Sequence, residues 1–122
     1  MKTDEKKCAC KGANLDRFIQ PMILLILMNG PDTGYGIYKR VGNFSMFREE
    51  KPDVTGVYRY LRVMEKRGIL EQFEYKEAEN KYKTKYRITE EGKVCLENWK
   101  KTLSEYAESI LELVACMEKS GS

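Results

Sequence analysis

DVTGVYRYLRVMEKRGIL, residues 53–70, separates into an apolar side and a basic side when it is wound into a helix. At about 100° per residue, Val57, Leu61 and Met64 fall on one face, which is the spacing of a helix that packs on a core. The opposite face is a column of polar residues in which every charge is positive: Thr55, Arg59, Arg62 and Lys66. Glu65 is well off this column. We expect a short helix that ends at Gly68 and presents a basic outer face.

An apolar helix is predicted ahead of this one. Residues 14–30, NLDRFIQPMILLILMNG, are apolar on most sides, and Asn14 is of the type that caps a helix. We therefore expect this helix to be central to the core. Pro21 removes one backbone hydrogen bond, so the first turn is expected to be separate or kinked.

A second helix is predicted over residues 32–42, DTGYGIYKRVG, where Asp32 or Thr33 serves as the cap. A loop over residues 43–52 then leads to the basic helix. Three helices joined by short turns, the third of them basic, indicate a helix-turn-helix arrangement.

A β-hairpin is predicted after the basic helix. ILEQFEY, residues 69–75, and KYKTKYRIT, residues 81–89, flank a polar loop, KEAEN, residues 76–80. In the second segment, apolar or neutral residues alternate with Lys81, Lys83, Lys85 and Arg87, the period of a half-buried strand. One face is expected to pack while the other carries the cations, as in the wing of a winged helix.

The last predicted element is a long helix that begins at the cap Thr89, with Glu90 and Glu91 in its first turn. Its apolar residues are spaced alternately three and four apart, which is the seam of a coiled coil. They are Leu96, Trp99, Leu103, Tyr106, Ile110, Leu113 and Met117. Because the domain already has a core, this seam needs a partner, and the same helix of a second subunit is the economical one.

Composition narrows the function. The chain has 122 residues, a net charge of +3 and no histidine, which removes the commonest general base and metal ligand. An enzyme is therefore the weakest interpretation. The charge is uneven, since residues 1–89 are basic and residues 90–122 are acidic. The longest apolar run is too short to span a bilayer, so we expect a soluble, cytoplasmic protein without membrane contact.

The basic helix beside a basic strand favours double-stranded DNA as the partner, although a solvated helix face is the ordinary explanation of a charged column. The predicted contacts come from three elements. They are Thr55, Arg59, Arg62 and Lys66 of the basic helix, with a hydroxyl contact from Tyr60; Tyr38 and Lys39 of the preceding helix; and Lys81, Lys83 and Lys85 of the wing. Arginine suits this task because its planar fork binds a phosphate or a guanine edge with two hydrogen bonds.

Two further features have a plain and a sharper explanation. Trp99 is either ordinary interface packing or the wall of an effector pocket between subunits, where its flat indole would stack on a planar aromatic molecule. Cys8 and Cys10 form a C-x-C pair that could bind a soft metal or metalloid, or sense an oxidant. Two thiolates seldom make a metal site alone, so no cofactor is expected with certainty, and the plain explanation is a tail without a site.

Three motifs in order resemble the PadR-like family of transcriptional regulators. FIQPMILLILMNGPDTGYGIYKRV, residues 18–41, is similar to the family's first two helices, and VYRYLRVMEKRGIL, residues 57–70, to its recognition helix. KYRITEEGK, residues 85–93, is similar to the end of its wing. The resemblance implies a homodimeric winged helix-turn-helix protein, usually a repressor that an effector releases from its operator. Some small members bind flat aromatic compounds near the position of Trp99.

The predicted fold is mostly α with a small β-hairpin: a tail over residues 1–13, a winged helix over 14–92, and a dimerisation helix with a short tail over 93–122. The predicted function is a sequence-specific, ligand-responsive homodimeric repressor that binds a palindromic operator. Two alternatives stay open at this point. One is a regulator whose trigger is thiol chemistry at Cys8 and Cys10, and the other is a winged-helix module whose basic face meets an acidic protein.

Overall fold

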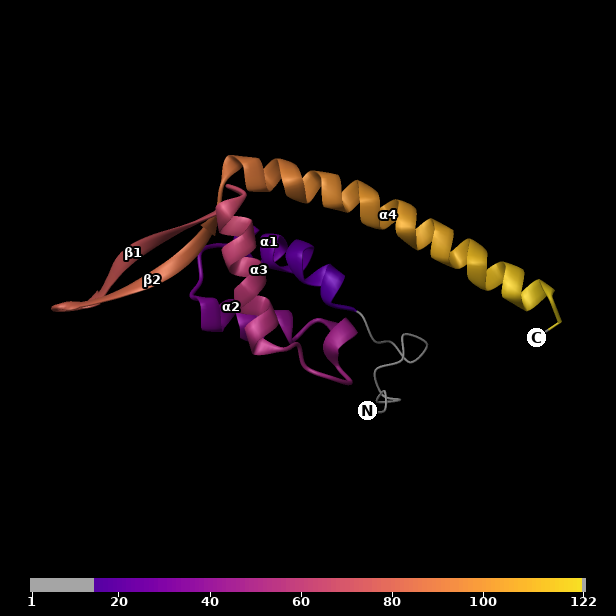
Figure 1. Ribbon diagram of the computed structural model, residues 1–122, viewed down its shortest axis with the longest axis horizontal. Coiled ribbons are helices and arrows are strands. Elements are labelled where there is room, and N and C mark those ends of the chain that lie inside the picture. Colours follow the sequence, from indigo (N-terminus) through magenta and orange to yellow (C-terminus); the bar gives the residue numbers. More distant parts are fainter. Residues whose placement is uncertain (1–14, 122) are drawn as a thin grey trace.

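The computed structural model describes residues 15–121, which form four α-helices, two short 3-10 helices and a two-stranded antiparallel sheet (Figure 1). In chain order the elements are η3 (Leu15–Phe18), α1 (Ile19–Met28), α2 (Gly34–Val41), η4 (Ser45–Phe47), α3 (Val54–Lys66), β1 (Leu70–Ala78), β2 (Lys81–Ile88) and α4 (Glu90–Lys119). The architecture is the winged helix-turn-helix that the sequence predicts, with α2 and α3 as the helix pair and the β-hairpin as the wing.

The core is built around α1, as its apolar composition predicts. Ile23 and Leu24 of α1 are fully buried, and α2 contributes Ile37 and Val41. The predicted inner face of α3 is confirmed, because Val57, Leu61 and Met64 are each fully buried. Each fully buried aliphatic side chain of this size contributes about 1.5–3 kcal/mol to folding.

The first predicted helix is divided in two. Its first turn is the separate 3-10 helix η3, and the regular helix α1 begins at Ile19. Pro21 lies in the first turn of α1, where a backbone N–H would have no intrahelical partner anyway. The separate first turn is thus confirmed, while the predicted cap Asn14 lies outside the described residues.

The ends of α3 are fixed by local hydrogen bonds. The Asp53 carboxylate accepts a hydrogen bond of 2.9 Å from the Gly56 N–H, which caps the first turn. At the other end Gly68 has a φ of 82°, and the N–H groups of Gly68 and Ile69 donate to the carbonyls of Glu65 and Met64. This is a Schellman ending, which turns the chain sharply into β1.

The hairpin differs from its prediction in two respects. β1 continues to Ala78, and only Glu79 and Asn80 turn the chain, so the predicted loop over residues 76–80 is wrong in length. Asn80 has a φ of 59°, a left-handed conformation that asparagine tolerates in tight turns. Packing is also confined to the base of β2, because Tyr86 and Ile88 contact the core whereas Tyr82 and Thr84 are exposed.

Helix α4 begins where the predicted cap lies. The Thr89 hydroxyl accepts a hydrogen bond from the Gly92 N–H and donates one of 2.7 Å to the Gly68 carbonyl. Gly92 is buried, and a Cβ placed there would collide with the carbonyl oxygen of Ile69. The absence of a side chain therefore lets α4 start directly against the end of α3.

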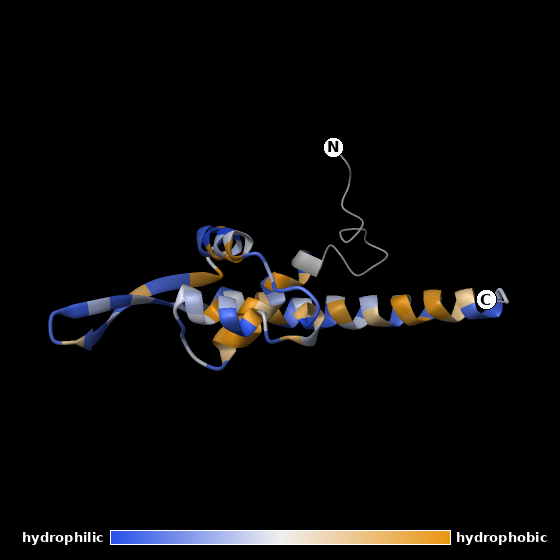
Figure 2. Cartoon of the chain, turned by 90° about the horizontal axis from the view of Figure 1, so that it is seen from below, coloured by the Kyte–Doolittle hydropathy of each residue, from blue (hydrophilic) through white to orange (hydrophobic). Residues whose placement is uncertain are grey.

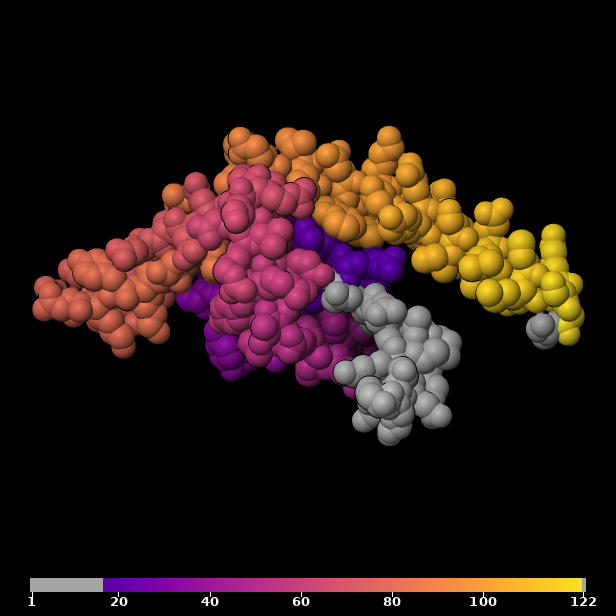
Figure 3. Space-filling model, viewed as in Figure 1, coloured from indigo at the N-terminus to yellow at the C-terminus, as the bar shows by residue number. Residues whose placement is uncertain are grey.

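Beyond its first half α4 projects away from the body of the domain (Figures 1 and 3). Hydrophobic bands continue along the projecting part, whereas the outer part of the hairpin is mostly hydrophilic (Figure 2). No helix within residues 15–121 has the length and apolar character needed to cross a membrane.

Candidate nucleic-acid interface

The outer face of α3 carries the predicted polar column in full. Thr55, Arg59, Arg62 and Lys66 are all exposed. Within residues 15–121, none of the three cations has an ion-pair partner. Their charges are therefore available to an external anion, on a helix whose opposite face is held rigidly by the core.

Close contact between α2 and α3 fixes the orientation of this column. A Cβ placed on Gly34, the first residue of α2, would lie 2.6 Å from Cε1 of Tyr58. The glycine thus lets the Tyr58 ring pack against the start of α2. Tyr58 is accordingly a packing residue, half-buried against the core.

Tyr60 lies beside the column and is half-buried. Its ring packs against the core, and the Arg59 guanidinium lies 5.2 Å from the ring centre. The predicted hydroxyl contact of Tyr60 with DNA stays a prediction, while packing holds most of its side chain. Its ring also supports Arg59 through a cation–π contact.

Helix α2 adds a small aromatic and basic surface. Of the predicted pair, Lys39 is exposed and Tyr38 is half-buried against the core. Tyr35, which sequence reasoning missed, is 60% exposed; its ring lies 5.6 Å from the Lys39 ammonium and 6.2 Å from the Tyr38 ring. The only signal in the sequence is that glycines flank Tyr35 on both sides.

The wing is tied to the start of α2 through Asp32. Its backbone exchanges two hydrogen bonds with Tyr86 of β2, of 3.2 and 2.8 Å, and its carboxylate contacts Arg40 at 3.3 Å. Burial raises the pKa of the Tyr86 phenol, the nearby Glu65 and Tyr58 raise it further, and Arg62 opposes them. The base of the wing therefore lies close to α3 as well as to the start of α2.

The predicted row of cations on the wing has partners on β1. Lys81, Lys83 and Arg87 each form an ion pair with a glutamate of β1, and the Lys85 ammonium lies over the Tyr75 ring. The strand register places these acidic and aromatic residues of β1 among the cations, on the face that the sequence predicts to be basic. These residues come together only in the folded hairpin.

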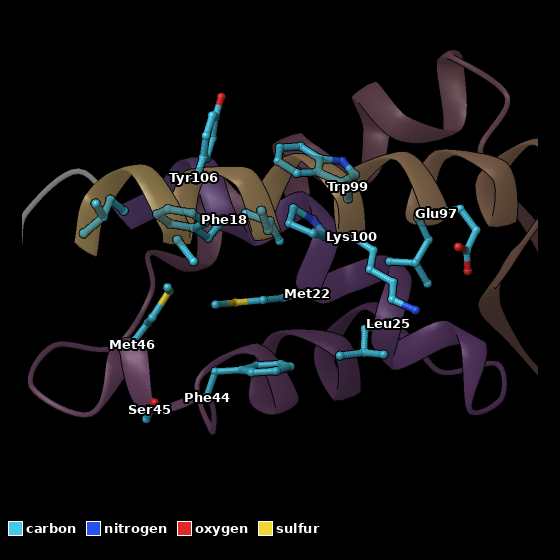
Figure 4. Close-up of a pocket in the computed structure, with 15 residues that line it drawn as sticks. Phe18, Met22, Leu25, Phe44, Ser45, Met46, Glu97, Trp99, Lys100 and Tyr106 are labelled. Carbon is cyan, nitrogen blue, oxygen red and sulfur yellow. The ribbon is translucent and has the colours of Figure 1, made fainter. Parts of the chain in front are cut away.

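A groove of about 670 Å³ lies between α4, α1 and η4 (Figure 4). Trp99 and Tyr106 come from α4, Met22 and Leu25 from α1, and Met46 from η4. Apart from Ser45, Glu97 and Lys100, its lining consists of apolar and aromatic side chains. Trp99 thus lies in a concave apolar site, on the helix predicted to form the dimer.

The predicted seam of α4 divides into two parts. Leu96 and Trp99 pack against the chain's own core, and Leu103 is half-buried. The remaining seam residues are about half exposed, from 47% for Tyr106 to 56% for Leu113. These are Tyr106, Ile110, Leu113 and Met117, and Leu111 and Val114 widen the exposed apolar strip beside them.

The hypothesis of a thiol-based metal or redox site concerns two cysteines near the start of the chain. Cys8 and Cys10 lie outside the described residues. In the part of the chain that the structure describes, Cys95 and Cys116 are free thiols, and no group of three or more metal-binding side chains occurs.

The helix-turn-helix, the hairpin after its second helix and the free cations on α3 define a winged-helix protein. The chain belongs to the transcriptional regulator PadR-like family, whose model matches residues 23–98. It is therefore a transcriptional regulator and not an enzyme. Among proteins with curated descriptions, no sequence matches the chain.

Solved structures share the fold at low identity. A transcriptional regulator from Clostridium thermocellum is 23% identical with a TM-score of 0.69, and the match covers 79% of this chain and 89% of that one. A PadR family regulator from Clostridium difficile is 23% identical with a TM-score of 0.68, over 80% of this chain and 98% of that one. Bacillus subtilis PadR, solved in complex with operator DNA, is 22% identical with a TM-score of 0.57, and the match covers 68% of this chain and 45% of that one.

Proposed function

We propose that this regulator binds double-stranded DNA through α3, which enters the major groove. The observation that carries the proposal is the column of Thr55, Arg59, Arg62 and Lys66, exposed on a helix whose other face is fully buried. The three cations have no ion-pair partner among residues 15–121, so DNA phosphates do not have to displace a carboxylate there. The complex of Bacillus subtilis PadR with operator DNA supports DNA binding by a chain of the same fold.

The surface around α3 supplies the sequence-independent contacts. Lys39 and the exposed Tyr35 of α2 flank the column and suit phosphate contacts, which position a protein on the duplex. Arg59 and Arg62 suit base edges, since a guanidinium binds guanine with two hydrogen bonds. Tyr38 belongs to the supporting core more than to the contact surface.

We further propose that the active form is a homodimer joined through α4. The projecting half of α4 exposes a wide apolar strip, and the groove beside Trp99 is apolar and concave. A two-fold arrangement lets the projecting half of one α4 cover the groove of the other subunit, and the reverse. Such a dimer presents two α3 helices to successive major grooves, about 34 Å apart, and so matches a palindromic operator.

Repression would be relieved by a planar aromatic effector in the groove. The Trp99 indole offers a stacking surface, and Met22 and Met46 are flexible side chains that adapt to a ligand's shape. A ligand between α1 and α4 favours one spacing of the dimer helices, while the operator favours another. Each ligand then weakens the other's binding by the same factor. No metal or organic cofactor is required by this scheme.

Arg59→Ala tests the contact surface. Binding of fluorescent duplexes is measured for a duplex from immediately upstream of the regulator's own gene and for a scrambled duplex. If Arg59 reads a base, its loss costs about 1–3 kcal/mol on the first duplex and less on the second. Lys101→Ala on α4 is the matched control, because it removes one exposed charge away from α3. Equal losses for the two variants would contradict the proposal.

A further inference from the structure

The cations of the wing are engaged inside the hairpin. The Glu77 carboxylate lies 3.6 Å from the Lys81 ammonium and 3.5 Å from that of Lys83. At the base of the wing, Arg87 donates a hydrogen bond of 2.7 Å to Glu71. All of these residues project from one face of the hairpin, since Glu71 pairs with Arg87 and Tyr75 with Lys83 across the strands.

Two aromatic rings of β1 also contact this row of cations. The Lys85 ammonium is 4.3 Å from the centre of the Tyr75 ring, and the Arg87 guanidinium is 4.4 Å from that of Phe73. Every cation of the row therefore has a partner on β1. The strand register shifts between Lys76 and Ala78, and this bulge places Glu77 at the end of the row, beside two lysines at once.

The cations of α3 differ in having no carboxylate partner, although the Arg59 guanidinium lies 5.2 Å from the centre of the Tyr60 ring. Arg59, Arg62 and Lys66 are exposed and have no ion pair within residues 15–121, although α3 and the wing both belong to the basic part of the chain, residues 1–89. A phosphate that approaches α3 meets cations that are not paired with a carboxylate. A phosphate that approaches the wing must first replace a carboxylate.

We infer that Glu77 acts as an internal competitor of DNA phosphate, which holds Lys81 and Lys83 and so limits the affinity of the wing for DNA. The inference rests on the proposed DNA binding. It assigns to Glu77 the control of the wing's contribution, with Glu71 in the equivalent position at Arg87. Binding energy is thereby concentrated in α3, the element that can read bases.

This competition should change how steeply the affinity for DNA falls with salt concentration. Each phosphate neutralised by a lysine releases a condensed cation, which makes affinity fall steeply with salt. When Glu77 is displaced, its freed carboxylate attracts a cation back and cancels part of that release. The wild-type protein should therefore show a shallower salt slope than a protein without the Glu77 charge.

Glu77→Gln tests this directly, with Glu74→Gln as its matched control. Both substitutions remove one exposed carboxylate from β1, but Glu74 lies on the other face of the hairpin, opposite Thr84, and has no ion pair within residues 15–121. Affinity for a scrambled fluorescent duplex is measured over a salt series that includes an ionic strength of about 0.15 M, where charges more than about 8 Å apart are largely screened. Melting curves of all variants are recorded in parallel.

Glu77→Gln should tighten binding roughly two- to fivefold, the range that exposed ion pairs reach, and steepen the salt slope, while Glu74→Gln leaves both within error. Lys83→Gln should then weaken binding more in the Glu77→Gln background than in the wild type. A lower melting temperature without tighter DNA binding would show that Glu77 serves only the hairpin, and would overturn the inference.

Two other results would also overturn it, and they are distinguishable. Equal effects of Glu77→Gln and Glu74→Gln would show a general charge effect, with the proposed DNA binding intact. If the wild-type protein binds no duplex at any salt concentration, the DNA-binding proposal falls together with this inference.

Discussion

Three single residues, two of them glycines, lie where elements of this fold come into close contact. Gly92 lies where α4 passes closest to the end of α3, and Gly34 where the Tyr58 ring covers the start of α2. Tyr86 links the wing to Asp32 through its backbone while its ring packs against the core. The stability of the domain should therefore be unusually sensitive at these positions.

Gly92→Ala is expected to destabilise the domain by about 1–3 kcal/mol, because the new Cβ would collide with the Ile69 carbonyl and lie 2.6 Å from Cγ1 of Ile88. Urea unfolding followed by circular dichroism measures this change. Gly56→Ala is the control: Gly56 is also the third residue of its helix, and the nearest neighbour of its Cβ would be 3.5 Å away. Alanine there should be neutral, or stabilising by up to about 1 kcal/mol. A Gly92→Ala variant as stable as the wild type would contradict the close contact between Gly92 and Ile69.

Tyr86 gives the domain a pH dependence at the alkaline end. Burial raises the pKa of its phenol above the ordinary value of 10.0. Between that value and the raised one, the unfolded chain has released the proton while the folded domain retains it. The unfolded state then binds fewer protons, so the free energy of unfolding falls as the pH rises through this window.

Urea unfolding at a series of pH values from neutral to above the ordinary tyrosine pKa should therefore show a shallower decline for Tyr86→Phe than for the wild type. Tyr82→Phe is the matched control, because Tyr82 is 60% exposed on the same strand. If the free energy of unfolding declined identically for Tyr86→Phe and the wild type, burial would not raise the pKa of this phenol.

At the scale of elements, the sequence predicts a helix or strand best where its buried residues recur at a regular spacing. The inner face of α3 and the cap of α4 at Thr89 needed only helical spacing and residue type. The pairing of Glu77 with Lys83 required the strand register, which depends on a bulge that no local pattern indicates. Tyr35 was missed because a tyrosine is as often packed as exposed, and only the fold decides which.

The surfaces that line the groove opposite Trp99 could not be predicted for a related reason. Trp99 was singled out, but the surfaces opposite it come from α1 and η4, more than fifty residues earlier in the chain. Helical periodicity places Trp99 on a face of α4 and does not say what that face meets. The docking of α4 on α1 decides which seam residues stay available to a second subunit.

Helix α4 provides a test of the dimer at this scale. Leu113→Glu places a charge in the middle of the exposed apolar strip, where it should weaken self-association by several kcal/mol if the strip is buried between subunits. Size-exclusion chromatography with light scattering measures the mass of each species. Ala115→Glu adds the same charge two residues away, off the seam, and should leave the mass unchanged. A wild-type monomer, or two variants with the same mass as wild type, would contradict the proposed interface.

At the scale of the whole molecule, the chain separates two tasks along its length. The basic part up to β2 carries α3 and the wing, and the acidic α4 carries the apolar strip and much of the groove. Joined as a two-fold dimer, these parts would connect an effector in the groove to the spacing of the two α3 helices. A winged-helix module for an acidic protein would share the basic surface but would not need a defined spacing.

The central claim is specific DNA binding, and one titration tests it most directly. Fluorescence anisotropy of the purified protein is measured with a duplex from immediately upstream of its own gene and with a scrambled duplex, over a salt series. The account predicts tight, steeply salt-dependent binding to the first duplex and much weaker binding to the second. Equal, weak binding to both duplexes would contradict it and point to a protein partner for the basic surface.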